Sequence, residues 1–328
     1  MIGFNAEQSS GFTEFDSPRP VKMRTQHEEV LGTQWSFVKD DWIVPVRQTF
    51  NRLEAGHYSL RHSNSIGQYF VKENMELNKL IYLPNEAGNL IRDDIRKFWT
   101  LEDAYKKYDR VYCRNFLIYS APGTGKTSLI NLMCKELIEE LDGIVININY
   151  EWELELYPDA IKRIRSIEPD RKIIVVIEDI DNFIPNENSF QTKSTDSTLL
   201  NVLDGNYKTS GVVTIATTNY IERIPERYTN RPSRFDRVIE FPLPNEESRR
   251  LFIENSVLPE DLNKIDVNEW VKKTEGFTID HINELLMLFF VFGHSEEESF
   301  ETIERMTKKN SSLKNSTSVN RTNIGFNG

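Results

Sequence analysis

Residues 172–181 read KIIVVIEDID, an apolar run of five residues that ends abruptly in carboxylates. A strand without polar alternation is typical of a parallel sheet that is covered on both faces. Parallel strands need long crossover connections, which helices usually supply. This run therefore predicts an α/β fold, in which a doubly wound parallel sheet presents acidic side chains at a strand end.

Other segments fit the same architecture, because short apolar runs alternate with helical patterns. We expect strands at 116–119, 144–148, 173–177, 212–216 and 238–241, and helices at 127–141, 159–167 and 196–203. After Pro242 the pattern becomes helical throughout, with helices expected at 246–255, 267–273, 278–292 and 296–306. The sheet should therefore be followed by a small all-α subdomain.

These patterns divide the chain into five segments. The N-terminal 1–40 is polar and is expected to be poorly ordered or extended, and 307–328 is a basic polar tail. Segment 41–105 has strand-length apolar runs and then a helical spacing, which predicts a small β-rich N-terminal element plus a helix. The large α/β subdomain is expected at 106–245 and the helical subdomain at 246–306.

The first strand of the α/β segment runs into a glycine-rich loop. Residues 120–128 read SAPGTGKTS and precede a helix. In such a loop the backbone N–H groups bind phosphates, the lysine neutralises the β- and γ-phosphates, and the next hydroxyl binds Mg²⁺. We therefore expect ATP and Mg²⁺ as cofactors, held by Ala121, Pro122, Gly123, Thr124, Gly125, Lys126, Thr127 and Ser128. Ser120 stands where the pattern has glycine, a tolerated departure because that position only begins the turn.

The carboxylates that end the run 172–181 have a role in this scheme. A parallel strand lying beside the phosphate loop brings its carboxyl end to the metal and the γ-phosphate. By position, Glu178 is the expected metal ligand together with Thr127, and Asp179 is expected to polarise the attacking water. Asn219 follows the next strand, where an amide would hold that water. Asp181 is expected to be structural or to lie at an interface.

Two arginines, Arg231 and Arg234, follow in the segment NRPSRFDR. From the residues alone they are either surface charges or groups that reach a neighbouring subunit's ATP. The net charge of −11 argues against broad binding of nucleic acid. Neither a membrane span nor a secretory signal is apparent, which predicts a cytoplasmic protein.

The ordered series of motifs resembles the AAA family of ATPases over roughly 106–306. APGTGKTS resembles its Walker A motif, VVIEDID its Walker B, TIATTN its sensor 1, and RPSRFDR the region that carries paired arginine fingers. The resemblance implies that Arg231 and Arg234 are these fingers. It also implies that residues 276–285 (GFTIDHINEL) belong to the lid helix that closes on the adenine, and that the protein forms a homo-oligomeric ring, a hexamer.

Within that family the Glu-Asp order and LLNVLDG most resemble the Bcs-type branch, and CRNFLIY resembles phage and bacterial AAA proteins of uncertain role. Two features depart from the resemblance. No transmembrane segment is apparent, so the membrane role of the Bcs-type branch is not expected here. In place of the aromatic pore loop the chain has the acidic stretch YEWELELY at 150–157. Trp152 or Tyr157 would face a pore or pack in the core.

We therefore expect a chaperone-like, ring-forming AAA protein that hydrolyses ATP to remodel or translocate a protein client. Two alternatives remain open. One is a nucleotide-switched scaffold with little hydrolysis, and the other is a DNA-associated loader-type ATPase, which the acidic balance disfavours.

Overall fold

The computed structural model describes residues 34–39, 42–46, 49–64, 67–74, 80–184, 193–204, 210–231 and 234–319. The chain divides into two units, residues 1–50 and 51–328. In the first unit, β1 (Gln34–Lys39) pairs antiparallel with β2 (Trp42–Val46). Strand β1 lies inside the segment 1–40, which the sequence predicts to be poorly ordered or extended, and residues 1–33 lie outside the described residues.

The second unit is built on a seven-stranded sheet of order β4-β3-β6-β7-β8-β5-β9. The strands are β3 (Gly56–Ser63), β4 (Gly67–Glu73), β5 (Cys113–Tyr119), β6 (Ile144–Asn147), β7 (Ile173–Ile177), β8 (Val212–Thr218) and β9 (Arg237–Glu240). Only the edge pair β3–β4 is antiparallel among these described pairings. The predicted α/β fold with a parallel sheet is therefore confirmed.

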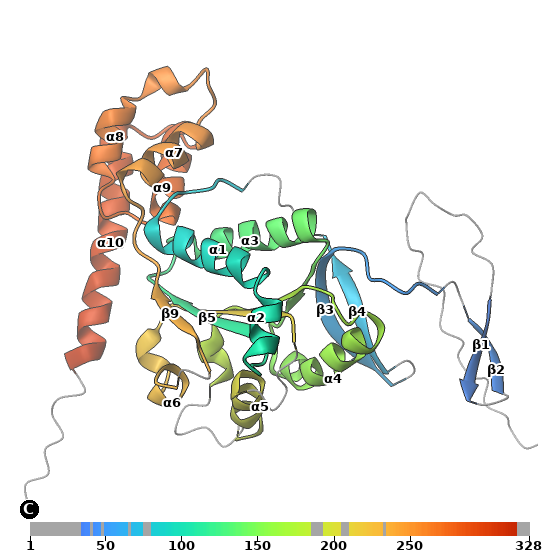
Figure 1. The fold of residues 1–328 in the computed structure, drawn as a ribbon. Helices are drawn as coiled ribbons and strands as arrows, with labels where there is room; N and C mark the ends of the chain where they lie inside the picture. The colour runs from blue at the N-terminus through green and yellow to red at the C-terminus, as the bar shows by residue number, and fades with distance from the viewer. Residues whose placement is uncertain are drawn as a thin grey trace, which may run out of the picture. The chain divides into compact units, whose positions relative to one another are not determined.

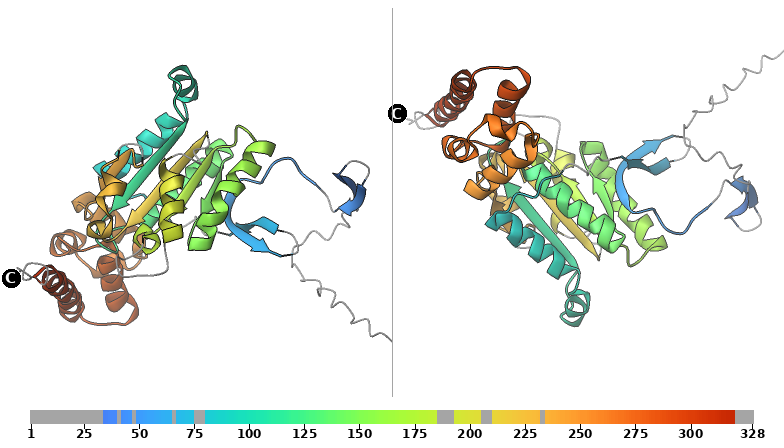
Figure 2. Two further views of the ribbon diagram at one scale, coloured as in Figure 1. Left: turned by 90° about the horizontal axis from the view of Figure 1, so that it is seen from below. Right: turned by 90° about the horizontal axis from the view of Figure 1, so that it is seen from above.

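Helices cover both faces of this sheet (Figures 1 and 2). Helices α1 (Glu86–Phe98) and α3 (Lys126–Leu141) pack on one face, and α4 (Glu151–Ile167) and α5 (Lys193–Asp204) on the other. All five residues of β7 are buried, because its alternate side chains enter the two cores. The shorter elements are α2 (Glu102–Lys107), η1 (Ile180–Phe183), η2 (Ile221–Arg223), α6 (Glu226–Thr229) and η3 (Leu262–Lys264).

Two details of the sheet differ from the sequence prediction. Strands β3 and β4, predicted within a separate N-terminal element, extend the main sheet, because β3 pairs in parallel with β6. Tyr58 and Leu60 of β3 enter the same core as β6 and β7, which explains this docking. Strand β7 was expected beside β5, but β8 lies between them.

Helix α4 begins at Glu151, earlier than the predicted start at 159. Pro158 lies inside α4, although proline usually favours the first turn of a helix. The predicted acidic loop at 150–157 is therefore largely helical. Its Glu153 is fully buried and accepts hydrogen bonds from the backbone N–H groups of Asn149 and Tyr150 at the start of the helix.

The C-terminal helices form a subdomain with its own core around Trp270. They are α7 (Glu246–Ser256), α8 (Val267–Lys273), α9 (Ile279–Leu286) with the π-helical turn η4 (Met287–Val291), and α10 (Glu296–Val319). Helix α10 continues past Met306, where the sequence predicted the start of a polar tail, and residues 320–328 lie outside the described part. Among the described helices, none is both long and apolar enough to span a bilayer.

Candidate functional site

The glycine-rich loop connects β5 to α3, which begins at Lys126. Gly123 and Gly125 have φ angles of +77° and +103°, which L side chains rarely adopt. The Ser120 hydroxyl lies 2.6 Å from the Thr124 hydroxyl and accepts a hydrogen bond of 2.7 Å from the Lys126 ammonium group. The serine that departs from the phosphate-loop pattern therefore holds the side chain of the phosphate-binding lysine.

The predicted catalytic residues meet at the carboxyl edge of the sheet. Lys126 Nζ donates to Asn219 Oδ1 at 2.7 Å, and Asn219 Nδ2 donates to Asp179 Oδ1 at 3.2 Å. The Thr127 hydroxyl donates to Glu178 Oε2 at 3.4 Å. The parallel register explains the meeting, because β8 pairs with both β5 and β7 and all three strands end at this edge. The sequence thus predicted which side chains gather here.

Asp179 has a backbone conformation that fixes its position. Its φ angle of +48° is left-handed, a region that aspartate tolerates better than most residues. Its N–H donates to the Thr217 hydroxyl at 3.1 Å. Asp181, by contrast, accepts a 2.7 Å bond from the Thr218 hydroxyl and pairs with Arg223 at 3.5 Å. Asp181 therefore has a local structural role.

Charge is unevenly balanced at this edge. Burial raises the pKa of Glu178, and the Asp179 charge adds to this, while the Thr127 hydroxyl and Lys126 oppose it. Burial lowers the pKa of Lys126, whereas the charges of Asp179, Glu178 and Asp280 raise it. Several carboxylates thus face one ammonium group, an arrangement that a divalent cation would balance.

A cavity of about 600 Å³ adjoins the cluster. Its lining consists of residues 122–128 with Glu178, Asp179, Thr217, Asn219 and Asp280. The residues present fit a nucleotide and Mg²⁺. The loop backbone precedes a sixteen-residue helix, where anions bind, and the neighbouring hydroxyl and carboxylate of Thr127 and Glu178 are the oxygen ligands that Mg²⁺ prefers.

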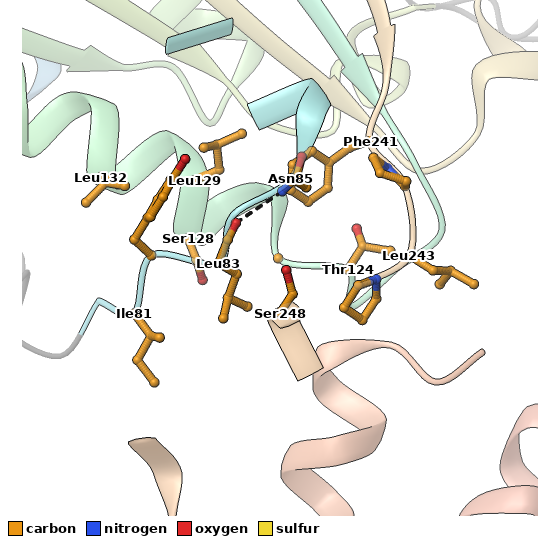
Figure 3. Close-up of a pocket in the computed structure, with 14 residues that line it drawn as sticks. Ile81, Leu83, Asn85, Thr124, Ser128, Leu129, Leu132, Phe241, Leu243 and Ser248 are labelled. Carbon is orange, nitrogen blue, oxygen red and sulfur yellow. Dashed lines mark hydrogen bonds between the residues drawn. The ribbon is translucent and has the colours of Figure 1, made fainter. Parts of the chain in front are cut away.

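A second, narrow pocket lies next to the first and shares Thr124, Gly125 and Ser128 with it. Its other lining residues are Ile81–Leu83, Asn85, Leu129, Leu132, Phe241–Pro244 and Ser248. Figure 3 shows these mainly apolar side chains around the pocket, with Asn85 donating to the Leu83 carbonyl. This pocket is therefore a mainly apolar surface directly beside the phosphate loop.

Sequence reasoning missed this second pocket. It predicted a strand-length run at 77–84, whereas residues 80–85 are irregular, and it assigned the adenine contact to residues 276–285. In the structure, Ile279 lies 3.9 Å from the position of a Cβ on Gly125, and Asp280 lines the phosphate cavity. The adenine contact of 276–285 stays a prediction. The apolar run at 80–83 could have indicated this pocket, but the other lining residues, at 124–132 and 241–248, lie far away in the sequence.

The two predicted fingers differ in exposure. Arg231 is exposed, whereas Arg234 is 5% exposed and its guanidinium donates to the Arg227 carbonyl. The Arg234 carbonyl accepts a bond from Asn115, near the start of β5. Asn115 lies five residues before Ser120, or about 16 Å along an extended strand. Both arginines therefore stand toward the edge of the sheet opposite the phosphate loop of their own chain.

The two candidate pore aromatics, Tyr157 and Trp152, also differ in exposure. Tyr157 is 4% exposed and belongs to the core between α4 and the sheet, so the core assignment holds for it. Trp152 is 41% exposed, stacks on Tyr150 with ring centroids 5.9 Å apart, and has the Arg61 guanidinium 5.3 Å from its ring.

A comparison with known protein families adds to this geometry. Residues 116–243 match the model of the "ATPase family associated with various cellular activities (AAA)". This match contains the loop, both carboxylates, Asn219 and both arginines. The chain carries an AAA domain. The matched region thus contains the sheet edge at which the candidate site lies.

Several curated proteins are similar to this chain. "Probable mitochondrial chaperone BCS1-B" from Dictyostelium discoideum is 25% identical over 70% of this chain and 55% of the relative. "Mitochondrial chaperone BCS1" from Danio rerio is 30% identical over 62% of this chain and 53% of the relative. "ATP-dependent zinc metalloprotease FtsH 2" from Thermoanaerobacter sp. is 30% identical over 66% and 45%, respectively. The matched region spans about half the length of these relatives, and the likeness to BCS1-type proteins agrees with the predicted Bcs-type branch.

Proposed function

We propose that this protein is a Mg²⁺-dependent ATP hydrolase that works as a homo-oligomeric ring, a hexamer, and couples ATP turnover to the remodelling of a protein client. The observation that carries the proposal is the hydrogen-bonded series Lys126–Asn219–Asp179, which lies beside the cavity of about 600 Å³. Each of these three groups was predicted separately, from a different strand end. Their meeting supports a hydrolytic site.

The residues have separate roles in this proposal. Lys126 and the loop N–H groups would bind the phosphates, and Thr127 and Glu178 would hold Mg²⁺, which neutralises phosphate charge when bound. Asp179 would accept a proton from the attacking water, and Asn219 would orient that water. The hydrogen bond between Asn219 and Asp179 brings the two side chains close enough to contact one water molecule.

The ring is supported by the position of Arg231. This side chain is exposed and stands toward the sheet edge opposite its own phosphate loop. An arginine so placed would add positive charge at the site of a neighbouring subunit. Arg234 would first have to release the Arg227 carbonyl, so Arg231 is the better supported finger.

The decisive experiment replaces Asp179 by Asn and measures ATP binding, ring assembly and phosphate release on the full chain. Asparagine preserves the shape of the side chain but is a far weaker base. We expect ATP binding and assembly to persist, while Mg²⁺-dependent turnover falls at least about a hundredfold, the usual size of a general-base contribution.

One result would reject the hydrolase, and another would reject the protein client. If the wild-type protein binds ATP and assembles but does not turn it over, the protein is a nucleotide-switched scaffold. If turnover is stimulated by DNA and not by proteins that co-purify with the Asp179→Asn variant, the loader-type reading replaces the protein client.

A further inference from the structure

The lid subdomain places a carboxylate against the phosphate loop. The backbone N–H of Asp280, in the first turn of α9, donates to the Gly123 carbonyl at 3.2 Å. The Asp280 side chain lies directly over Gly123, because a Cβ built on that glycine would be 2.7 Å from Asp280 Oδ2. Among the described residues, Asp280 is the one from the helical subdomain that lines the phosphate cavity.

The position of Asp280 is unfavourable for the binding of a further negative charge, such as a phosphate. The loop N–H groups and Lys126 attract phosphate, yet Asp280 adds its charge to those of Glu178 and Asp179 around the same cavity. Divalent metal would offset the two acids at the strand end, where Thr127 also lies. Asp280 stands on the opposite subdomain and contacts the loop backbone through Gly123.

An acidic residue in the first turn of a helix is common, since it interacts favourably with the helix dipole. That effect accounts for an acid at the start of α9, but it requires no contact with the loop. Glu284, one turn further along the same helix, is exposed and does not line the cavity. The two acids therefore share a helix and a charge and differ in their distance from the phosphates.

We propose that Asp280 is a specificity-determining residue, whose carboxylate opposes the phosphate tail so that the lid discriminates between nucleotides by their number of phosphates. This inference rests on the proposed binding of ATP at the same site. A nucleotide with more phosphates meets stronger repulsion from Asp280, and the start of α9 moves away from Gly123 to relieve it. The position of the lid thereby becomes sensitive to hydrolysis and phosphate release.

The test measures the affinities of adenosine, AMP, ADP and ATP for the wild-type chain and for Asp280→Asn by calorimetry at low salt, first without Mg²⁺ and then, for ATP, with it. We expect the variant to bind ATP about three- to tenfold more tightly, as for one screened charge at a partly solvated distance. The gain should shrink from ATP to AMP and vanish for adenosine. It should also shrink as salt rises from about 0.05 M to about 0.5 M, because salt screens exposed charges.

Two controls separate charge from shape. Asp280→Glu keeps the charge and should retain the wild-type affinity for ATP, whereas Glu284→Gln removes a charge from the same helix and should change no affinity. Thermal melting of each variant verifies the fold.

The outcomes are distinct. Equal ATP affinities of Asp280→Asn and the wild type overturn the inference. So does weaker adenosine binding by the variant, which would indicate a hydrogen bond to the ribose, or weaker binding confined to samples with Mg²⁺, which would indicate a metal ligand. In these cases the wild type still binds ATP and the proposed function stands. If the wild type binds no nucleotide, the proposed function fails and this inference fails with it.

Discussion

Replacing Glu153 by alanine should destabilise the protein strongly, although the residue lies in an acidic surface-like stretch. Its side chain is 0% exposed, accepts bonds of 2.7 Å and 3.3 Å from the Asn149 and Tyr150 N–H groups, and pairs with Arg61. Losing the acceptor of a fully buried donor costs about 1–3 kcal/mol, and the partly buried N–H groups here lie toward the lower end of that range. Breaking a buried ion pair costs about 3–5 kcal/mol, but the 36% exposed side chain of Arg61 reaches water and lowers that cost.

The expected loss is therefore about 2–4 kcal/mol, which corresponds to a fall in melting temperature of roughly 5–10 °C for a domain of this size. Differential scanning calorimetry without nucleotide measures it. Glu155→Ala is the matched control, since Glu155 is exposed on the same helix and its removal should change the melting temperature by little. If the two variants melt alike, Glu153 is not the buried anchor described here and the reassignment of the acidic stretch to α4 fails.

Three further predictions follow from the site and the fingers. Because burial raises the pKa of Glu178 in the folded protein, its ionised form costs stability once the pH exceeds the unfolded value, and that cost grows as the pH rises through the folded value. Glu178→Gln should therefore melt above the wild type near about pH 8 and with it near about pH 3, below the unfolded value, where both states are protonated. Arg231→Ala should keep ATP binding but lose turnover at least about tenfold, and mixing it with Asp179→Asn should restore part of the activity. No recovery in the mixture would argue against a finger acting between subunits. Arg234→Ala should lower stability by about 1–3 kcal/mol, because a buried guanidinium that bonds a carbonyl is removed; unchanged urea unfolding would contradict this.

The sequence predicted those parts of the fold that local chemistry decides. Strand β7 was readable because five consecutive apolar residues suit a strand covered on both sides. Lys126, Glu178, Asp179 and Asn219 were readable because each follows a strand, and parallel strands present their carboxyl ends at one edge.

Features that depend on packing between residues far apart in the sequence could not be predicted in this way. The insertion of β8 between β5 and β7 is a choice of strand order that no single segment encodes. The docking of β3 on β6 depends on Tyr58 and Leu60 fitting a core built from later residues. In the sequence, Glu153 is one of several acids in the stretch 150–157, and nothing there marks it as buried. Its hydrogen bonds form only because α4 begins before Pro158.

The strand order has a consequence for how the protein is made. Gly56 of β3 pairs opposite Ile144, Cys113 of β5 opposite Val212, and Leu117 opposite Val238. Each pairing closes a long loop, and such non-local contacts slow folding. During synthesis, β3 and β4 leave the ribosome long before β6, and β5 before both of its neighbours. The apolar strand that carries the phosphate loop therefore stays unpaired until β8 and β9 have been made, and its exposed apolar surface favours aggregation during that interval.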